Sequence, residues 1–261
     1  MRKAILALGL GVLLAGGLCA QQPKPLIGVA TFKVKPDKSG EWLETMKKLY
    51  TGLLEKLLNE GAVTVYGIGF DVLHRPGQVN ASVWFETPNF AAYGKVVEAI
   101  QQLQQKDPAW VERLMAYHDA EAHRDLLLQM IEANGRAVGA GTLPYTMVSV
   151  VKAREGAQDE LIESFKKYSL PVLDKLVAEG AINFYSLLRE ALHGEDPATV
   201  YFVVSMNDLG GIDKMFAAEA EAVKALPEGE RKTRQESLRK LADMTAHRDW
   251  LMRAAVFAMK Q

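Results

Sequence analysis

The tetrapeptide Ala-His-Arg-Asp occurs twice in the chain, at residues 122–125 and again at 246–249. In each copy a histidine and an aspartate are two residues apart, so on an extended chain their side chains lie on one face and the arginine on the other. A carboxylate next to an imidazole fixes the ring tautomer and raises its basicity, as general base catalysis or metal ligation requires. The candidate catalytic groups are therefore two pairs, His123 with Asp125 and His247 with Asp249.

A structural role is the preferred interpretation of the same residues. Each tetrapeptide precedes an apolar run, LLLQMI at 126–131 and WLMRAAVFAM at 250–259. The histidine could cap the carbonyl groups of a preceding helix and the aspartate could pair with the arginine, which would close a junction needed in both places. We predict no metal site, because two ligands in each copy fall short of the three that a catalytic zinc ion needs.

The repeated tetrapeptide belongs to a longer internal similarity. Residues 53–74 align with residues 172–193 at a constant offset of 119, which places Tyr66 on Tyr185. At the tetrapeptides the offset is 124, which indicates a five-residue insertion in the second copy. We infer that the chain is a tandem duplication, with a first unit at 26–132, a Gly-rich linker at 133–143 and a second unit at 144–261.

Hydrophobic periodicity predicts the elements of one unit. We expect strands at 26–35, 62–74 and 80–87, and helices at 41–60, 89–105 and 108–121, with Gly61 ending the first helix. The run after the tetrapeptide could end the last helix or form a fourth strand. Because the corresponding run continues to the chain end with bulky β-compatible residues, we favour the strand. The order β-α-β-β-α-β is that of a ferredoxin-like unit.

Two such units in one chain resemble the dimeric α/β-barrel superfamily, which includes NIPSNAP-like, EthD-like and antibiotic-biosynthesis-monooxygenase-like proteins. The similarity rests on element order and on the stretch FKVKPDKSGEWLE at 32–44. It implies an α+β fold in which two ferredoxin-like sheets face each other as a pseudo-dimeric barrel. In the cofactor-free monooxygenases of this superfamily an Asn, a Trp and an acid or Arg commonly line the cavity. The third strand carries Asn80 and Trp84, but the second unit has Thr199 and Val203 there.

Alternation along the second strand of each unit suggests ligand contacts. Tyr66 and Tyr185 occupy the same place in the two units, and Arg189 shares a face with Tyr185. A tyrosine beside an arginine could hold a ligand oxygen. The alternative is a core tyrosine whose hydroxyl group bonds to the backbone. The candidate ligand-binding residues are Tyr66, Trp84, Tyr185 and Arg189.

The remaining histidines are weaker candidates. We expect His74 and His193 on exposed hairpin loops at the rim, where they could contact a ligand. His118 has no counterpart in the second unit, and we expect it on the surface or between helices.

The N-terminal residues have the plan of a secretory signal peptide. Arg2 and Lys3 precede a short apolar run, and Ala20 suits cleavage. An uncleaved anchor or a lipid-modified Cys19 are the alternatives. Cleavage would leave a chain without cysteine, with 29 basic against 32 acidic residues. We therefore predict an exported protein, periplasmic or secreted, with no nucleic-acid partner and no stable membrane insertion.

These observations predict a protein that binds a small apolar or aromatic ligand and carries no cofactor. One alternative is a cofactor-independent monooxygenase or isomerase acting on an aromatic or quinol-like substrate, with Tyr66, Trp84, His123, Tyr185 and His247 as its leading residues. Another is a structural module that binds a protein partner, and a homo-oligomer stays open. A cavity with Tyr185 and His247 within reach of each other would favour the enzyme. A cavity filled by Met and Leu would favour the structural role.

Overall fold

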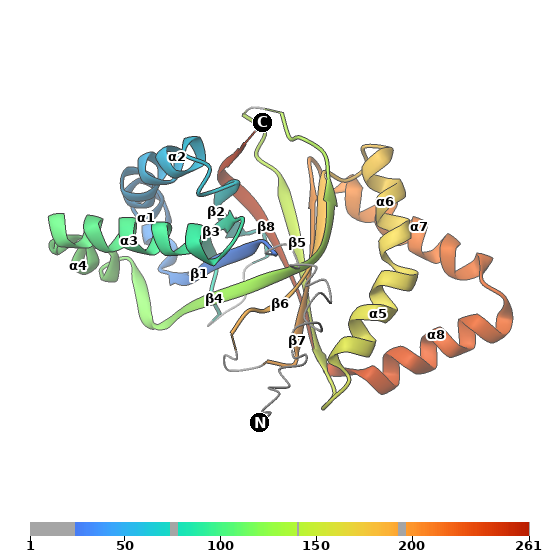
Figure 1. The fold of residues 1–261 in the computed structure, drawn as a ribbon. Helices are drawn as coiled ribbons and strands as arrows, with labels where there is room; N and C mark the ends of the chain where they lie inside the picture. The colour runs from blue at the N-terminus through green and yellow to red at the C-terminus, as the bar shows by residue number, and fades with distance from the viewer. Residues whose placement is uncertain (1–23, 74–77, 140, 193–196, 261) are drawn as a thin grey trace, which may run out of the picture.

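Eight antiparallel strands close into one barrel in the order β1-β3-β2-β8-β5-β7-β6-β4 (Figure 1). The computed structural model describes residues 24–73, 78–139, 141–192 and 197–260. The predicted signal peptide and the two hairpin histidines, His74 and His193, lie outside these residues. The strands are β1 (Leu26–Val34), β2 (Val65–Asp71), β3 (Ala81–Thr87), β4 (His118–Gly135), β5 (Tyr145–Ala153), β6 (Phe184–Glu190), β7 (Thr199–Met206) and β8 (Ala242–Met259).

Helices cover the barrel on two opposite sides (Figure 1). The first group follows β1 and β3 and comprises α1 (Ser39–Met46), α2 (Gly52–Asn59), α3 (Phe90–Lys106) and α4 (Ala109–Met115). The second group follows β5 and β7 and comprises α5 (Gln158–Tyr168), α6 (Leu170–Ala178), α7 (Gly210–Ala225) and α8 (Glu228–Leu241). None of the described helices is long and apolar enough to cross a membrane. The predicted α+β class is confirmed.

The segments after both tetrapeptides are strands, as predicted. β4 and β8 begin earlier than expected, however, and the helix predicted at 108–121 ends at Met115. Val34 of β1 pairs with His118, and Lys33 pairs with Asp119. Lys35 also donates a hydrogen bond to the carbonyl group of Ala116, at 2.9 Å. These long-range contacts with β1 override the local helical pattern.

The first predicted helix, 41–60, is interrupted by a π-helical turn at Lys47–Thr51 and otherwise forms as expected. Gly61 ends it with φ of +75°, a left-handed conformation that glycine adopts without steric cost. The N–H of Ala62 then bonds to the carbonyl of Leu57, so the exposed helix end is satisfied. At the other end of this half, β4 continues to Gly135, inside the segment predicted as the linker.

Each strand has one face toward the helices and one toward the barrel interior. Leu128, Leu188 and Tyr201 are buried together inside the barrel with partly buried residues of β1, β4, β5 and β7. Trp84 also faces inward, where it covers Gly67 so closely that a Cβ atom there would lie 2.8 Å from the indole ring. Apolar side chains thus pack the barrel interior. We therefore expect a site in the space between the sheet and the helices.

Candidate functional site

Both His-Asp pairs face the helices, and both arginines point to the other face. In β8, Arg248 pairs with Val150, which packs inside the barrel, whereas His247 lines a cavity against α5 and α8. The same alternation holds in β4, where Ala30 pairs with Asp125. The predicted geometry of the tetrapeptides is therefore confirmed.

The second pair includes a third group. His247 Nε2 lies 3.3 Å from Asp249 Oδ1. The same carboxylate oxygen accepts a hydrogen bond from the hydroxyl group of Ser149 on β5, at 2.5 Å. The serine contacts the carboxylate and not the imidazole, so the arrangement does not activate a serine nucleophile. Instead, the carboxylate orients the imidazole ring as a hydrogen-bonding group or general base.

A cavity of about 360 Å³ lies beside His247, between the sheet and helices α5 and α8. Phe165 of α5 and Phe202 of β7 form one wall, with ring centroids 5.8 Å apart and planes 14° from parallel. The other apolar lining residues are Val151, Leu238, Ala242 and Met244, and the polar ones are Ser149, Gln235, Arg239 and His247. The site is an apolar slot with a few polar groups, the usual character of a small-molecule site.

The first pair is embedded in packed aromatic side chains. His123 Nδ1 lies 3.0 Å from the carbonyl oxygen of Thr31, and its Nε2 lies 3.3 Å from Asp125. Its ring stacks on Phe32 with centroids 4.7 Å apart. The hydrogen bond with Asp125 raises the pKa of His123. The prediction that this histidine caps the preceding helix was wrong: it bonds across the sheet to β1, because the chain has already entered the β4 strand.

The side chains packed around the two His-Asp pairs differ between the halves. At the offset of 119, Val151 stands in place of Phe32, and Leu161 stands in place of Trp42. Phe32 and Trp42 are buried with ring centroids 5.4 Å apart, and both belong to the first core cluster. The aromatic rings are placed differently in the second half, where Phe165 and Phe202 stand at the positions of Met46 and Val83.

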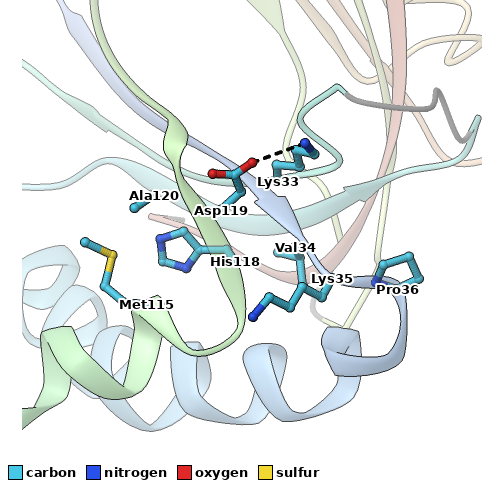
Figure 2. Close-up of a pocket in the computed structure, with 8 residues that line it drawn as sticks. All are labelled: Lys33, Val34, Lys35, Pro36, Met115, His118, Asp119 and Ala120. Atoms are coloured by element: carbon cyan, nitrogen blue, oxygen red, sulfur yellow. Dashed lines mark hydrogen bonds and ion pairs between the residues drawn. The ribbon is translucent and has the colours of Figure 1, made fainter.

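A more open cavity of about 470 Å³ lies at the start of β4 (Figure 2). Lys33 forms an ion pair of 3.2 Å with Asp119 above it, and His118 lies at its centre beside Met115 (Figure 2). The expectation of a surface or interhelix His118 was wrong. The residue is buried, with its ring edge-on to Phe32 at 5.1 Å, because pairing with β1 draws it into the sheet. Burial lowers the pKa of His118.

The two predicted tyrosines face helices and do not line the cavity at His247. Tyr66 is buried beneath α2 and α3, and burial raises its pKa to about 12. Tyr185 is buried against α6, where its hydroxyl group donates a 2.7 Å hydrogen bond to Asp174. Burial is the first cause of the raised pKa of Tyr185, and the bond to Asp174 adds to it. Tyr185 and His247 therefore do not share a cavity.

The other two predicted ligand contacts also lie elsewhere. Arg189 donates to the side-chain oxygen of Gln129 at 3.3 Å and lies 3.8 Å from Asp159. Trp84 packs inside the barrel, with its ring centroid 6.0 Å from that of Phe257. Of the groups at this cavity, the sequence analysis named His247 and its neighbour Asp249 as candidates, and it did not name Ser149 or the two phenylalanines. The signal that could have found them was the difference between the halves, with Ser149 aligned on Ala30 and Val151 on Phe32.

Among the residues that the structure describes, no group of three or more His, Cys, Asp or Glu side chains is placed to hold a metal ion. The side chains of the cavity that could ligate a haem iron are His247 and Met244. The Nε2 atom of His247 already faces the Asp249 carboxylate, and Met244 is 55% exposed to solvent. Ligation of a haem iron through Nε2 of His247 would break its contact with Asp249.

Known proteins resemble this chain in fold and not in sequence. No protein-family model matches it, and no curated protein does. A chain from Lactobacillus acidophilus NCFM described as a "putative monooxygenase" superposes with a TM-score of 0.63 at 12% identity, over 91% of this chain and 97% of that one. An "anthrone oxidase-like protein" gives 0.53 at 12% identity, over 92% of this chain and 95% of that one.

A third solved structure, a heme-binding protein from Thermus thermophilus, gives a TM-score of 0.50 at 12% identity, over 88% of this chain and 91% of that one. The three proteins have different described functions. At such low identities the similarity shows the fold alone, an α+β protein with a closed antiparallel barrel of eight strands.

Proposed function

We propose that this protein binds a small, largely apolar aromatic ligand in the cavity beside His247. The observation that carries the proposal is the apolar slot itself, about 360 Å³ in volume, with stacked Phe165 and Phe202 on one side. Such a wall favours a flat ring, because aromatic side chains pack best against other rings in offset or edge-on contact. The imidazole of His247 offers a hydrogen-bond partner for a hydroxyl group on that ring.

A direct test is fluorescence titration with 2-naphthol, a flat bicyclic ring that carries one hydroxyl group. The wild-type protein should bind it with a dissociation constant on the order of 10 µM. Val151→Phe places in the second half the ring that Phe32 supplies in the first half, and it should weaken binding at least about tenfold. Leu209→Phe adds the same ring at an exposed position outside the cavity and serves as the matched control.

Val151 is buried, so overpacking there could destabilise the protein. Met244→Trp is therefore the second variant, because Met244 is exposed at the edge of the cavity and a larger ring there obstructs the slot from outside. Both variants should lose affinity. Wild-type affinity in both, with a normal melting temperature, would show that the ligand binds elsewhere.

A second candidate function is cofactor-independent oxygenation of an activated aromatic substrate. It is favoured by the His247–Asp249 pair facing an apolar slot, where a neutral imidazole can remove a proton from an acidic C–H or O–H bond. The solved structure described as an anthrone oxidase-like protein has the same fold as this chain. With anthrone, one O₂ would be consumed for each molecule converted to anthraquinone and water. An oxygen electrode measures this uptake, and His247→Gln should abolish the enzyme-dependent part.

Two finer features of the chain are also part of the proposal. We infer a tandem duplication of ferredoxin-like units, supported by matching strand orders, β4-β1-β3-β2 in the first half and β8-β5-β7-β6 in the second. Export is supported by the residues at 1–20. The N-terminus of protein collected from outside the cytoplasm should begin at Gln21, and a lipid on Cys19 would contradict cleavage after Ala20. Gel filtration tests the open possibility of a homo-oligomer.

A further inference from the structure

We propose that the ligand of the His247 cavity carries an acidic group, a carboxylate on the end of the ring opposite its hydroxyl group, and that Arg239 and Arg154 receive it at the mouth. This inference rests on the proposed function and names the substrate class of the same site. The ligand would be a hydroxyaryl carboxylate, with its ring in the slot, its hydroxyl group at His247 and its acid at the rim.

The first observation is the position of the two arginines. Arg239 lies in the last turn of α8 and lines the cavity next to Leu238. Arg154, which follows β5, donates from Nε to the carbonyl oxygen of Arg239 at 3.4 Å. Its backbone N–H bonds to Leu241 at 2.8 Å, which fixes it at the same helix end. Arg154 is therefore held against the backbone of the helix end from which the Arg239 side chain lines the cavity.

The second observation is the charge of the surroundings. The cavity lining contains no Asp or Glu among the described residues. Within the described part of the chain, no carboxylate forms an ion pair with the side chain of Arg239 or Arg154. Two acids lie nearby: Asp243, whose pKa is lowered by its bond with Thr245 and, less strongly, by the charge of Arg154, and Asp249, which accepts from Ser149. The lining itself thus carries the charge of Arg239 and no acidic side chain among the described residues, while Asp243 offsets part of the charge of Arg154.

The first half provides an internal contrast. At the offset of 124, Met115 stands in place of Arg239 and faces the open cavity beside His118 (Figure 2). Both halves end their last helix at this point, so a helix end alone does not require an arginine there. A cation near a helix C-terminus is favourable by itself, and that simpler role predicts an effect on stability without an effect on ligand choice.

The experiment compares two probes that differ in one charge, 6-hydroxy-2-naphthoate and its methyl ester, by fluorescence titration at neutral pH. The wild-type protein should bind the acid about three to ten times more tightly than the ester, as expected for a charge-assisted contact at a partly exposed site. The preference should shrink as salt rises, because the contact lies at the rim. In Arg239→Gln the ratio of the two affinities should fall to about one, and in Arg239→Lys it should largely remain.

Arg231→Gln removes a charge from the exposed surface of α8 outside the cavity lining, and it should retain the wild-type ratio. The ratio cancels any general damage to the site, and a melting curve of each variant checks folding. Equal affinity for acid and ester in the wild-type protein, or an unchanged ratio in Arg239→Gln, overturns this inference and leaves the proposed function standing. Failure of both probes and of 2-naphthol to bind overturns the proposed function itself.

Discussion

Ser149 on β5 donates a hydrogen bond to Asp249 on β8, and this contact distinguishes the two copies of the His-Arg-Asp sequence. In the first half the residue paired with Asp125 is Ala30, which has no hydroxyl group. His123 is instead held by Thr31 and stacked on Phe32. The residues packed around the two copies of the motif therefore differ. We propose that the first copy has a structural role and that the second contacts the ligand.

The two histidines should respond differently to the same substitution. His247→Gln should weaken 2-naphthol binding about tenfold, because it removes the proposed partner of the ligand hydroxyl group, and should change the melting temperature little. His123→Gln should remove a ring stack and a hydrogen bond, costing about 1 to 2 kcal/mol and about 3 to 6 °C in melting temperature. Paired thermal melts and titrations measure both effects. A loss of stability in His247→Gln together with a loss of binding in His123→Gln would contradict the roles proposed for the two histidines.

The stability contributed by the His123–Asp125 pair should depend on pH. The pKa of His123 is raised in the folded protein, chiefly by its hydrogen bond with Asp125. The contribution is therefore fully present below the unfolded value of about 6.5 and is lost as pH rises through the folded pKa. The Asp125 side chain is 77% exposed, so the effect should be only a few tenths of a kcal/mol.

Urea unfolding at about pH 5.5 and pH 8.5, either side of the ordinary histidine pKa, measures this pH dependence. The stability difference between the wild type and Asp125→Asn should be larger at the lower pH. Glu121→Gln, which removes an exposed charge from the same strand, is the control. A larger difference at the higher pH would reverse the sign and exclude the His123–Asp125 coupling.

Removal of the Tyr185 hydroxyl group should affect stability and not binding. Tyr185→Phe leaves the ring in place but removes the 2.7 Å hydrogen bond to Asp174 on α6. The expected cost is about 1 kcal/mol, the usual value for such a bond. Affinity for 2-naphthol should stay at the wild-type value, because Tyr185 lies in a different cluster from the cavity. A clear loss of affinity in this variant would restore Tyr185 as a ligand contact.

The purified protein should be colourless. Nε2 of His247 faces Asp249, so iron ligation through that nitrogen would require the ring to leave the carboxylate. An absorption spectrum, recorded before and after incubation with haem, measures this directly. A Soret band that His247→Gln removes would show that the ring turns to bind iron and would replace the aromatic-ligand proposal.

The sequence was informative where the pattern is local or repeated. Because side chains alternate along a strand, the sequence predicted that His247 and Arg248 lie on opposite faces of the sheet. The aligned copies predicted a strand after each tetrapeptide. Gly61 ended its helix as expected. The predicted helix at 108–121 was too long, since it ends at Met115. His118 pairs instead with Val34, 84 residues away, and no local pattern contains such a contact.

The candidate site was predicted less completely for a similar reason. Period two places Tyr66 and Tyr185 on one face of their strands but does not say whether that face meets helices or the barrel interior. Whether a space between sheet and helix is filled depends on the sum of the side chains that meet there. The aromatic rings of this layer are Phe32 and Trp42 in the first half and Phe165 and Phe202 in the second, and their effect on packing becomes clear only when the strands are placed.

The central claim, that an aromatic ligand binds beside His247, can be tested most directly by NMR of the histidine side chains. With 2-naphthol added to protein labelled in its imidazole rings, the His247 signals should shift and saturate, while the signals of His123 and His118 should stay in place. Shifts at His123 without shifts at His247, or no shifts at a ligand concentration that saturates fluorescence, would contradict it.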